Sequence, residues 1–114
     1  MTQLRLLALM SMIAVGCSSS TDTPNNVDCN GTPPSYEEVT AFTKCVTCHD
    51  SKKTGAARVK APSNINFDSS EAALASADKA VSEVMKGDMP PRDSGITLTD
   101  AEKQQLYEWA MCTM

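Results

Sequence analysis

Apolar residues recur at helical spacing in three stretches of the chain. In the first, Val39, Phe42 and Val46 are three and four residues apart, so they would lie along one side of a helix. The segment Ser35–Glu38 precedes them and has the pattern of a capping box, in which a serine and a glutamate bind the first free backbone N–H groups. We therefore expect a helix to begin at this pattern and to continue into the segment Cys45–His49, which would lie at its end.

Two further helices are predicted downstream. The second stretch begins at Asp68 and ends at Gly87, a residue type that commonly terminates helices. Its apolar positions at helical intervals are Ala73, Leu74, Ala77, Val81, Val84 and Met85. The third stretch starts with another capping box, Thr99–Glu102, and ends near Cys112. Its apolar positions are Leu106, Trp109 and Ala110.

The segment 51–67 between the first two helices shows no apolar periodicity. It contains glycine, proline and asparagine residues, which favour loops. No part of the chain alternates polar and apolar residues over a length that would form a strand. We therefore expect an all-α fold, with three to four helices in one small domain over residues 35–114.

The N-terminal segment 1–16 has the features of a secretion signal: Arg5, then the apolar run Leu6–Val15, then small residues. The run is too short for a membrane-spanning helix, which needs about 20 residues. Ala14–Cys17 resembles the lipobox of bacterial lipoproteins, which implies acylation of Cys17; ordinary cleavage nearby is the alternative. Ser18 after this cysteine resembles lipoproteins directed to the outer membrane.

The polar segment 17–34 that follows has no apolar periodicity, so we expect a flexible tether between a lipid anchor and the folded domain. These features predict an exported protein on the periplasmic side, attached to a membrane, with the outer membrane favoured. The formal net charge of the chain is −4, and an acidic protein repels the phosphates of nucleic acids. Nucleic acid is therefore not an expected partner.

Cys45, Cys48 and His49 form a Cys-x-x-Cys-His sequence, the strongest chemical pattern in the chain. Two thiols on one helical turn can add to the vinyl groups at one edge of a haem, and the neighbouring imidazole can bind the iron. We therefore expect one covalently attached haem c. Two alternatives use the same residues: a thioredoxin-like redox pair, which would need a βαβ setting, and a zinc site completed by Cys29 or Cys112.

The second axial ligand of such a haem cannot be another histidine, because His49 is the only one in the sequence. Methionine, lysine, water or an open position remain, and a soft thioether suits haem iron. Met89 lies in Gly87-Asp-Met-Pro-Pro91, where a helix stop and a following proline favour an extended backbone that can direct the thioether inward. Met85 is the alternative, although its helical position suits core packing.

Cys29 and Cys112 flank the predicted domain and lie outside the haem motif. Export to an oxidising compartment favours a disulfide between them, which would close a long loop and stabilise a small domain. Two free thiols are the alternative. Cys17 would then be the unpaired fifth cysteine, as acylation requires.

Taken together, Cys45–His49, Gly87–Pro91, Leu98-Thr-x-x-Glu102 and Leu106-x-x-Trp109 resemble the class I cytochrome c family over residues 35–112. The resemblance implies that the first and last helices cross and that His49 and Met89 bind opposite faces of one haem, whose edge stays exposed for electron transfer. It also implies that a proline carbonyl, here that of Pro62, accepts a hydrogen bond from the other ring nitrogen of His49.

We therefore expect an electron carrier that exchanges electrons with redox partner proteins, and not an enzyme. A haem-based ligand sensor or a small haem enzyme with an open sixth site is the alternative. A basic run follows the haem motif and consists of Lys52, Lys53, Arg58 and Lys60. It could steer an acidic redox partner, although such runs more often form a solvated loop or neutralise haem propionates.

Overall fold

The computed structural model of the chain describes residues 27–113. The predicted secretion signal 1–16, the acylation site Cys17 and most of the predicted tether 17–34 therefore lie outside the described residues. Within the described range there are four α-helices and three short 3-10 helices, and there is no β-strand, as expected for an all-α fold. The α-helices are α1 (Ala41–Cys45), α2 (Ser70–Ala75), α3 (Ala77–Lys86) and α4 (Asp100–Thr113), and the 3-10 helices are Tyr36–Glu38, Gly55–Arg58 and Arg92–Ser94.

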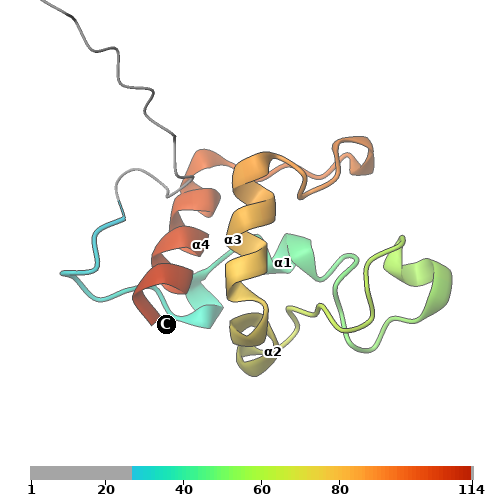
Figure 1. The fold of residues 1–114 in the computed structure, drawn as a ribbon, viewed down its shortest axis with the longest axis horizontal. Coiled ribbons are helices and arrows are strands. Elements are labelled where there is room, and N and C mark those ends of the chain that lie inside the picture. Colours follow the sequence, from blue (N-terminus) through green and yellow to red (C-terminus); the bar gives the residue numbers. More distant parts are fainter. Residues whose placement is uncertain (1–26, 114) are drawn as a thin grey trace, which may run out of the picture.

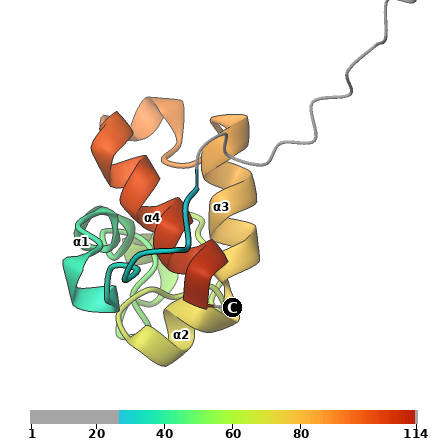
Figure 2. The same ribbon diagram turned by 90° about the vertical axis from the view of Figure 1, so that its left-hand side faces the viewer.

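The C-terminal helix α4 is central to the packing of the helices. It packs against both α1 and α3, and α3 runs beside it in the opposite direction (Figures 1 and 2). Phe42 of α1 contacts two other aromatic residues of the core. The centroid of its ring is 4.9 Å from that of Trp109, in an edge-to-face contact, and 5.7 Å from that of Phe67. All three aromatic residues are buried, together with Leu106 of α4, so they form the centre of the core.

The first predicted helix is divided. The predicted capping box forms, with the backbone N–H of Ser35 donating to the Glu38 carboxylate at 2.7 Å, but only a 3-10 turn follows. Val39 then takes an extended conformation, with φ of −78° and ψ of 92°. This β-branched residue is almost fully buried, so packing into the core, rather than helix propensity, decides its backbone.

The second predicted helix is also divided, into α2 and α3, at Ser76. Its backbone, with φ of −118° and ψ of 14°, is not helical, and the residue is buried. Serine competes with the helix for backbone hydrogen bonds, which makes it a common boundary residue. The third predicted helix forms as α4, and its capping box is complete: Thr99 N–H donates to Glu102 Oε2 at 2.8 Å, and Glu102 N–H donates to Thr99 Oγ1 at 3.1 Å.

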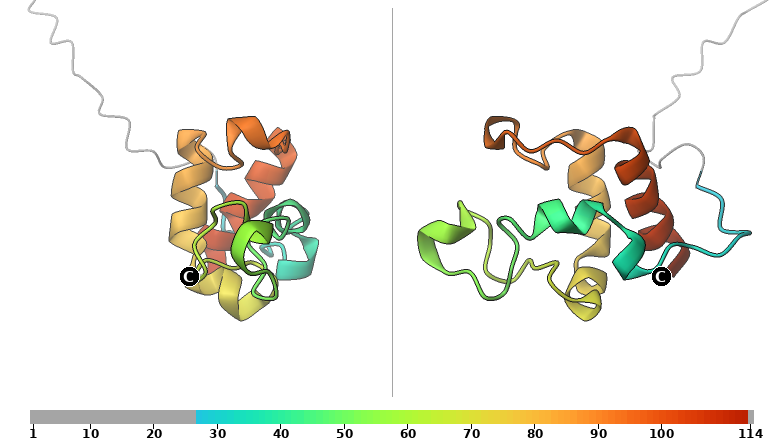
Figure 3. Two further views of the ribbon diagram at one scale, coloured as in Figure 1. Left: turned by 90° about the vertical axis from the view of Figure 1, so that its right-hand side faces the viewer. Right: turned by 180° about the vertical axis from the view of Figure 1, so that it is seen from behind.

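Two long connections extend to the same side of the helices (Figure 1). The first, residues 50–67, follows the Cys45–His49 motif, and the second, residues 87–99, carries Met89. The views from the side and from behind show the same arrangement (Figure 3). The chain segments with the predicted haem ligands therefore lie on one side of the molecule. Between residues 27 and 113, no helix has the length and apolar character needed to cross a membrane.

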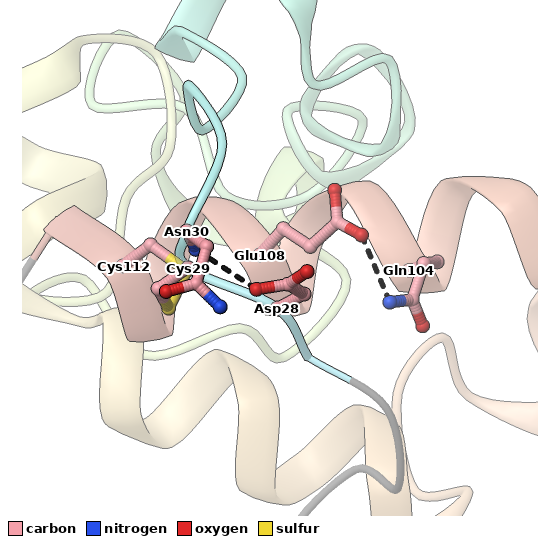
Figure 4. The surroundings of a disulfide bond; sticks show 6 residues. All are labelled: Asp28, Cys29, Asn30, Gln104, Glu108 and Cys112. Carbon is pink, nitrogen blue, oxygen red and sulfur yellow. Dashed lines mark hydrogen bonds between the residues drawn. A yellow bond between two sulfur atoms is a disulfide. The ribbon is translucent and has the colours of Figure 1, made fainter.

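Cys29 and Cys112 lie at disulfide distance, with sulfurs 1.99 Å apart, as the sequence predicts (Figure 4). The bond joins the irregular segment before the first 3-10 helix to the last turn of α4. On one side of it, Asn30 N–H donates to the Asp28 carboxylate at 2.9 Å, and on α4 the Gln104 amide donates to Glu108 at 2.9 Å. The disulfide therefore fastens the beginning of the described chain to its end.

Replacement of both cysteines by serine is expected to lower the free energy of unfolding by about 3 kcal/mol, because the bond restricts the unfolded chain over a long loop. The partners are 83 residues apart in the sequence. Urea denaturation of the oxidised protein and the double variant measures the difference. Adding a reductant to the unmodified protein should reproduce the loss, and an unchanged midpoint in both samples would contradict the prediction.

Candidate functional site

The Cys45–His49 motif sits at the end of α1, as the sequence predicts. Cys45 is the last residue of the helix, and its carbonyl accepts hydrogen bonds from Cys48 N–H at 3.2 Å and from His49 N–H at 2.9 Å. The motif thus continues as one tight turn. Both cysteines are free and half-buried. The structure therefore holds two thiols and an imidazole on a single turn.

The thiol of Cys45 is turned toward the apolar core. Burial raises the pKa of this thiol to about 11, because the thiolate would lose its hydration. The side chain is therefore a neutral thiol at physiological pH. Redox-active Cys-x-x-Cys pairs depend on a lowered thiol pKa, which is the opposite of what is found here. This difference disfavours the thioredoxin-like alternative.

His49 is fixed by contacts on two sides. Its Nδ1 lies 2.9 Å from the carbonyl oxygen of Ile65, and its ring meets that of Phe67 edge-to-face at 5.4 Å. Because a carbonyl oxygen only accepts, Nδ1 carries a proton, and in the neutral ring the lone pair is then on Nε2. The imidazole is therefore in the tautomer that binds a metal through Nε2.

The carbonyl partner of His49 is not the one that the family resemblance implies. The expected residue was Pro62, but its carbonyl accepts from Nη2 of Arg58 at 2.6 Å. Ile65 lies beside His49 instead, because the chain turns back between Pro62 and Ile65, where Ile65 N–H donates to the Pro62 carbonyl at 3.2 Å. The carbonyl that accepts from His49 therefore belongs to a residue three positions after the expected one.

Met89 is held by the end of α3. Gly87 has a left-handed backbone, with φ of +78°, and ends the helix as predicted. The carbonyl of Glu83 then accepts from both Asp88 N–H at 3.0 Å and Met89 N–H at 3.2 Å. Met89 is half-buried against the core, while Met85 is half-buried on α3 itself.

The hollow beside Met89 does not include the cysteine motif. It measures about 340 Å³ and is bordered by the 87–99 connection, Val84 and Lys103. Another hollow, of about 440 Å³, is lined by residues that include Tyr36, Phe42 and Val46. Neither His49 nor a cysteine of the motif lines it. The structure therefore brings the cysteines and His49 together on one turn, and places Met89 on a separate segment at the same side of the fold.

Lys44, next to the motif, ties it to the Met89 segment. Its Nζ donates to the Thr97 carbonyl at 2.8 Å and forms an ion pair with Glu102 at 2.7 Å. The hydrogen bond from Lys44, with those from Thr99, holds the pKa of the Glu102 carboxyl below its ordinary value of 4.5. One side chain thus connects the end of α1, the end of the 87–99 connection and the start of α4.

The basic run after the motif does not form one surface. Lys52 and Lys60 are exposed, but Arg58 is buried, with 5% of its surface accessible, and Lys53 Nζ donates to the Thr47 carbonyl at 2.5 Å. Arg58 therefore cannot contribute to docking of an acidic partner. The sequence does not predict this burial, because nothing in a loop segment distinguishes a buried arginine from a solvated one.

No protein-family model, curated protein or solved structure matches this chain. Within residues 27–113, no group of three or more histidine, cysteine, aspartate or glutamate side chains is arranged to hold a metal ion. Cys29 and Cys112, the thiols that could complete a zinc site with the motif, are bonded to each other. The function must therefore be inferred from the geometry of the motif itself.

Gly87→Ala is expected to destabilise the protein by about 1 kcal/mol, because an L residue is strained at a left-handed position. A new Cβ would meet no atom within 4 Å, so backbone strain is the only cost. Chemical denaturation measures the change, and Gly31→Ala, where a Cβ also meets open space, is the matched control. Equal stability of the two variants would contradict the role of Gly87 as a helix stop.

Glu102→Gln is expected to lower the free energy of unfolding by about 1 kcal/mol at neutral pH, because it removes a charge-assisted contact that is half-shielded from solvent. A carboxyl whose pKa is lowered by folding stabilises the protein above its ordinary pKa, and the effect disappears as pH falls through the lowered value. The difference from the unmodified protein should therefore shrink in denaturation curves recorded below about pH 4. Exposed Glu71→Gln is the control, and a pH-independent difference would contradict the assignment.

Proposed function

We propose that the protein is a single-haem c-type cytochrome that carries electrons. The observation that carries this proposal is the hydrogen bond of His49. Its Nδ1 donates to the Ile65 carbonyl, so Nε2 is left to bind a metal, on the same turn as two free thiols. A pair of thiols three residues apart, followed at once by a histidine in this tautomer, is the arrangement that covalent haem attachment uses.

Each motif residue has a distinct part in holding the haem. Cys45 and Cys48 would form thioether bonds, and His49 would bind the iron through Nε2. Two half-buried apolar residues belong to this region, Val46 within the motif and Ile65 beside His49, and an apolar ring placed against them would remove their side chains from water. The haem, once bound, supplies an iron that changes between its ferrous and ferric states. The protein determines the potential of that change through ligands, hydrogen bonds and burial.

Met89 would supply the second protein ligand of the iron. Its backbone is fixed by the Glu83 carbonyl, and its segment lies on the same side of the helices as the chain that follows His49 (Figures 1 and 3). A thioether ligand raises the reduction potential and leaves no free position for a substrate, which favours electron transfer over catalysis. A haem-based sensor or small haem enzyme is the alternative, and it requires that Met89 does not bind.

The cellular setting belongs to the same proposal and rests on the sequence. Residues 1–16 would direct export, Cys17 would carry the lipid anchor, and the following polar segment would let the domain reach its redox partners. Export also agrees with the disulfide between Cys29 and Cys112, because such bonds persist in oxidising compartments. We place the protein on the periplasmic side, anchored to the outer membrane.

The ligand set is tested by absorption spectra of protein produced with a haem-attachment system. A c-type reduced spectrum, with a weak near-infrared sulfur-to-iron band in the oxidised form, is expected for the unmodified protein and for the control Met85→Ala. Met89→Ala should lose the near-infrared band while keeping the covalent haem, because only the sixth ligand is removed. Loss of the band in Met85→Ala instead would assign the ligand to Met85, and absence of the band in the unmodified protein would favour the open-site alternative.

A further inference from the structure

Arg58 is the most extensively hydrogen-bonded side chain of the 50–67 connection. It is buried, and all of its hydrogen bonds go to neighbouring oxygens of the same connection. Nε donates to Ala61 O at 3.2 Å, Nη1 donates to Asp50 O at 2.7 Å and Lys53 O at 3.3 Å, and Nη2 donates to Pro62 O at 2.6 Å, Ile65 O at 3.0 Å and Asn66 Oδ1 at 2.9 Å. The connection is therefore wrapped around one guanidinium group.

A buried cation of this kind is costly unless polar groups replace its hydration. Between residues 27 and 113, no carboxylate forms an ion pair with Arg58, so oriented carbonyl oxygens provide the compensation. The planar fork of arginine matches this set of acceptors, which lysine, with its single ammonium group, does not. The positive charge of the side chain is thus retained inside the loop.

One of these acceptors is the oxygen that also binds the proposed haem ligand. The Ile65 carbonyl accepts from Nη2 of Arg58 at 3.0 Å and from Nδ1 of His49 at 2.9 Å. A carbonyl oxygen has two lone pairs, so both donors can be served at once. We propose that Arg58 is a positioning residue for His49, which holds the Ile65 carbonyl against the imidazole and raises the reduction potential of the site. This role rests on the proposed function.

The direction of the effect follows from the charge of the side chain. The guanidinium group shares the Ile65 oxygen with His49, so its positive charge lies close to the site and disfavours the more highly charged ferric state. The charge therefore stabilises the ferrous form, and removal of Arg58 lowers the potential.

The experiment uses the haem-loaded full chain with Arg58→Met, and Lys52→Met as the control that removes an exposed cation from the same connection. Spectroelectrochemistry measures the reduction potential, and proton NMR of the diamagnetic reduced form measures exchange of the His49 Nδ1–H. Arg58→Met is expected to have a lower potential and faster Nδ1–H exchange than the control. Arg58→Lys should keep a potential closer to that of the unmodified protein, because the charge remains, but still exchange faster.

Potentials and exchange rates that are equal in Arg58→Met and Lys52→Met would refute the role of Arg58. Where either Arg58 variant fails to fold, NMR of the unmodified reduced protein decides: slowly exchanging guanidinium protons with an Overhauser contact to the His49 Nδ1–H support the role, and fast exchange without that contact overturns it. Absence of covalent haem from the unmodified protein would refute the proposed function itself, whereas attached haem with unchanged potentials refutes only the inference about Arg58.

Discussion

The hydrogen bond between Nδ1 of His49 and the carbonyl of Ile65 is the interaction on which the site depends. It selects the ring tautomer, fixes the plane of the imidazole and leaves Nε2 free. It also joins the motif turn to the far end of the 50–67 connection, where Phe67 N–H returns a hydrogen bond to the His49 carbonyl at 2.9 Å. The far end of the connection is therefore closed onto His49 by two hydrogen bonds, one to its ring and one to its backbone carbonyl.

A few buried residues of the helices hold the Cys45–His49 turn in place. Phe42 lies one helical turn before Val46 and contacts Trp109 and Phe67, so α4 and the end of the loop are positioned by the helix that leads into the cysteine motif. Small domains bury too little apolar surface for high stability, and here a disulfide fastens the irregular start of the described chain to α4. A haem packed against the half-buried side chains would add to this limited core.

The features that the sequence predicts correctly have local causes or require a particular residue type. The capping box at Thr99, the stop at Gly87 and the compact turn from Cys45 to His49 each depend on residues within a few positions of one another. The all-α class followed from periodicity, and the pairing of Cys29 with Cys112 followed from counting the cysteines that the motif does not use. These interactions leave clear patterns in sequence because each needs a particular residue type.

The features that were missed depend on contacts between distant residues or on backbone atoms. The breaks at Val39 and Ser76 are set by burial, which periodicity alone does not reveal. The partner of His49 was assigned to Pro62 from a family resemblance, but any residue has a carbonyl, and only the path of the loop decides which one arrives. The burial of Arg58 follows from the same path, so a residue that resembled a solvated charge lies inside the site.

Covalent attachment of one haem by Cys45 and Cys48, beside His49, is measured most directly by the intact mass of the protein, made with a haem-attachment system and analysed under denaturing conditions. The unmodified chain is expected to gain the mass of one haem, and this gain is expected to disappear when Cys45 and Cys48 are both replaced by serine. A folded, exported and unmodified protein without the added mass would show that the motif holds no covalent haem.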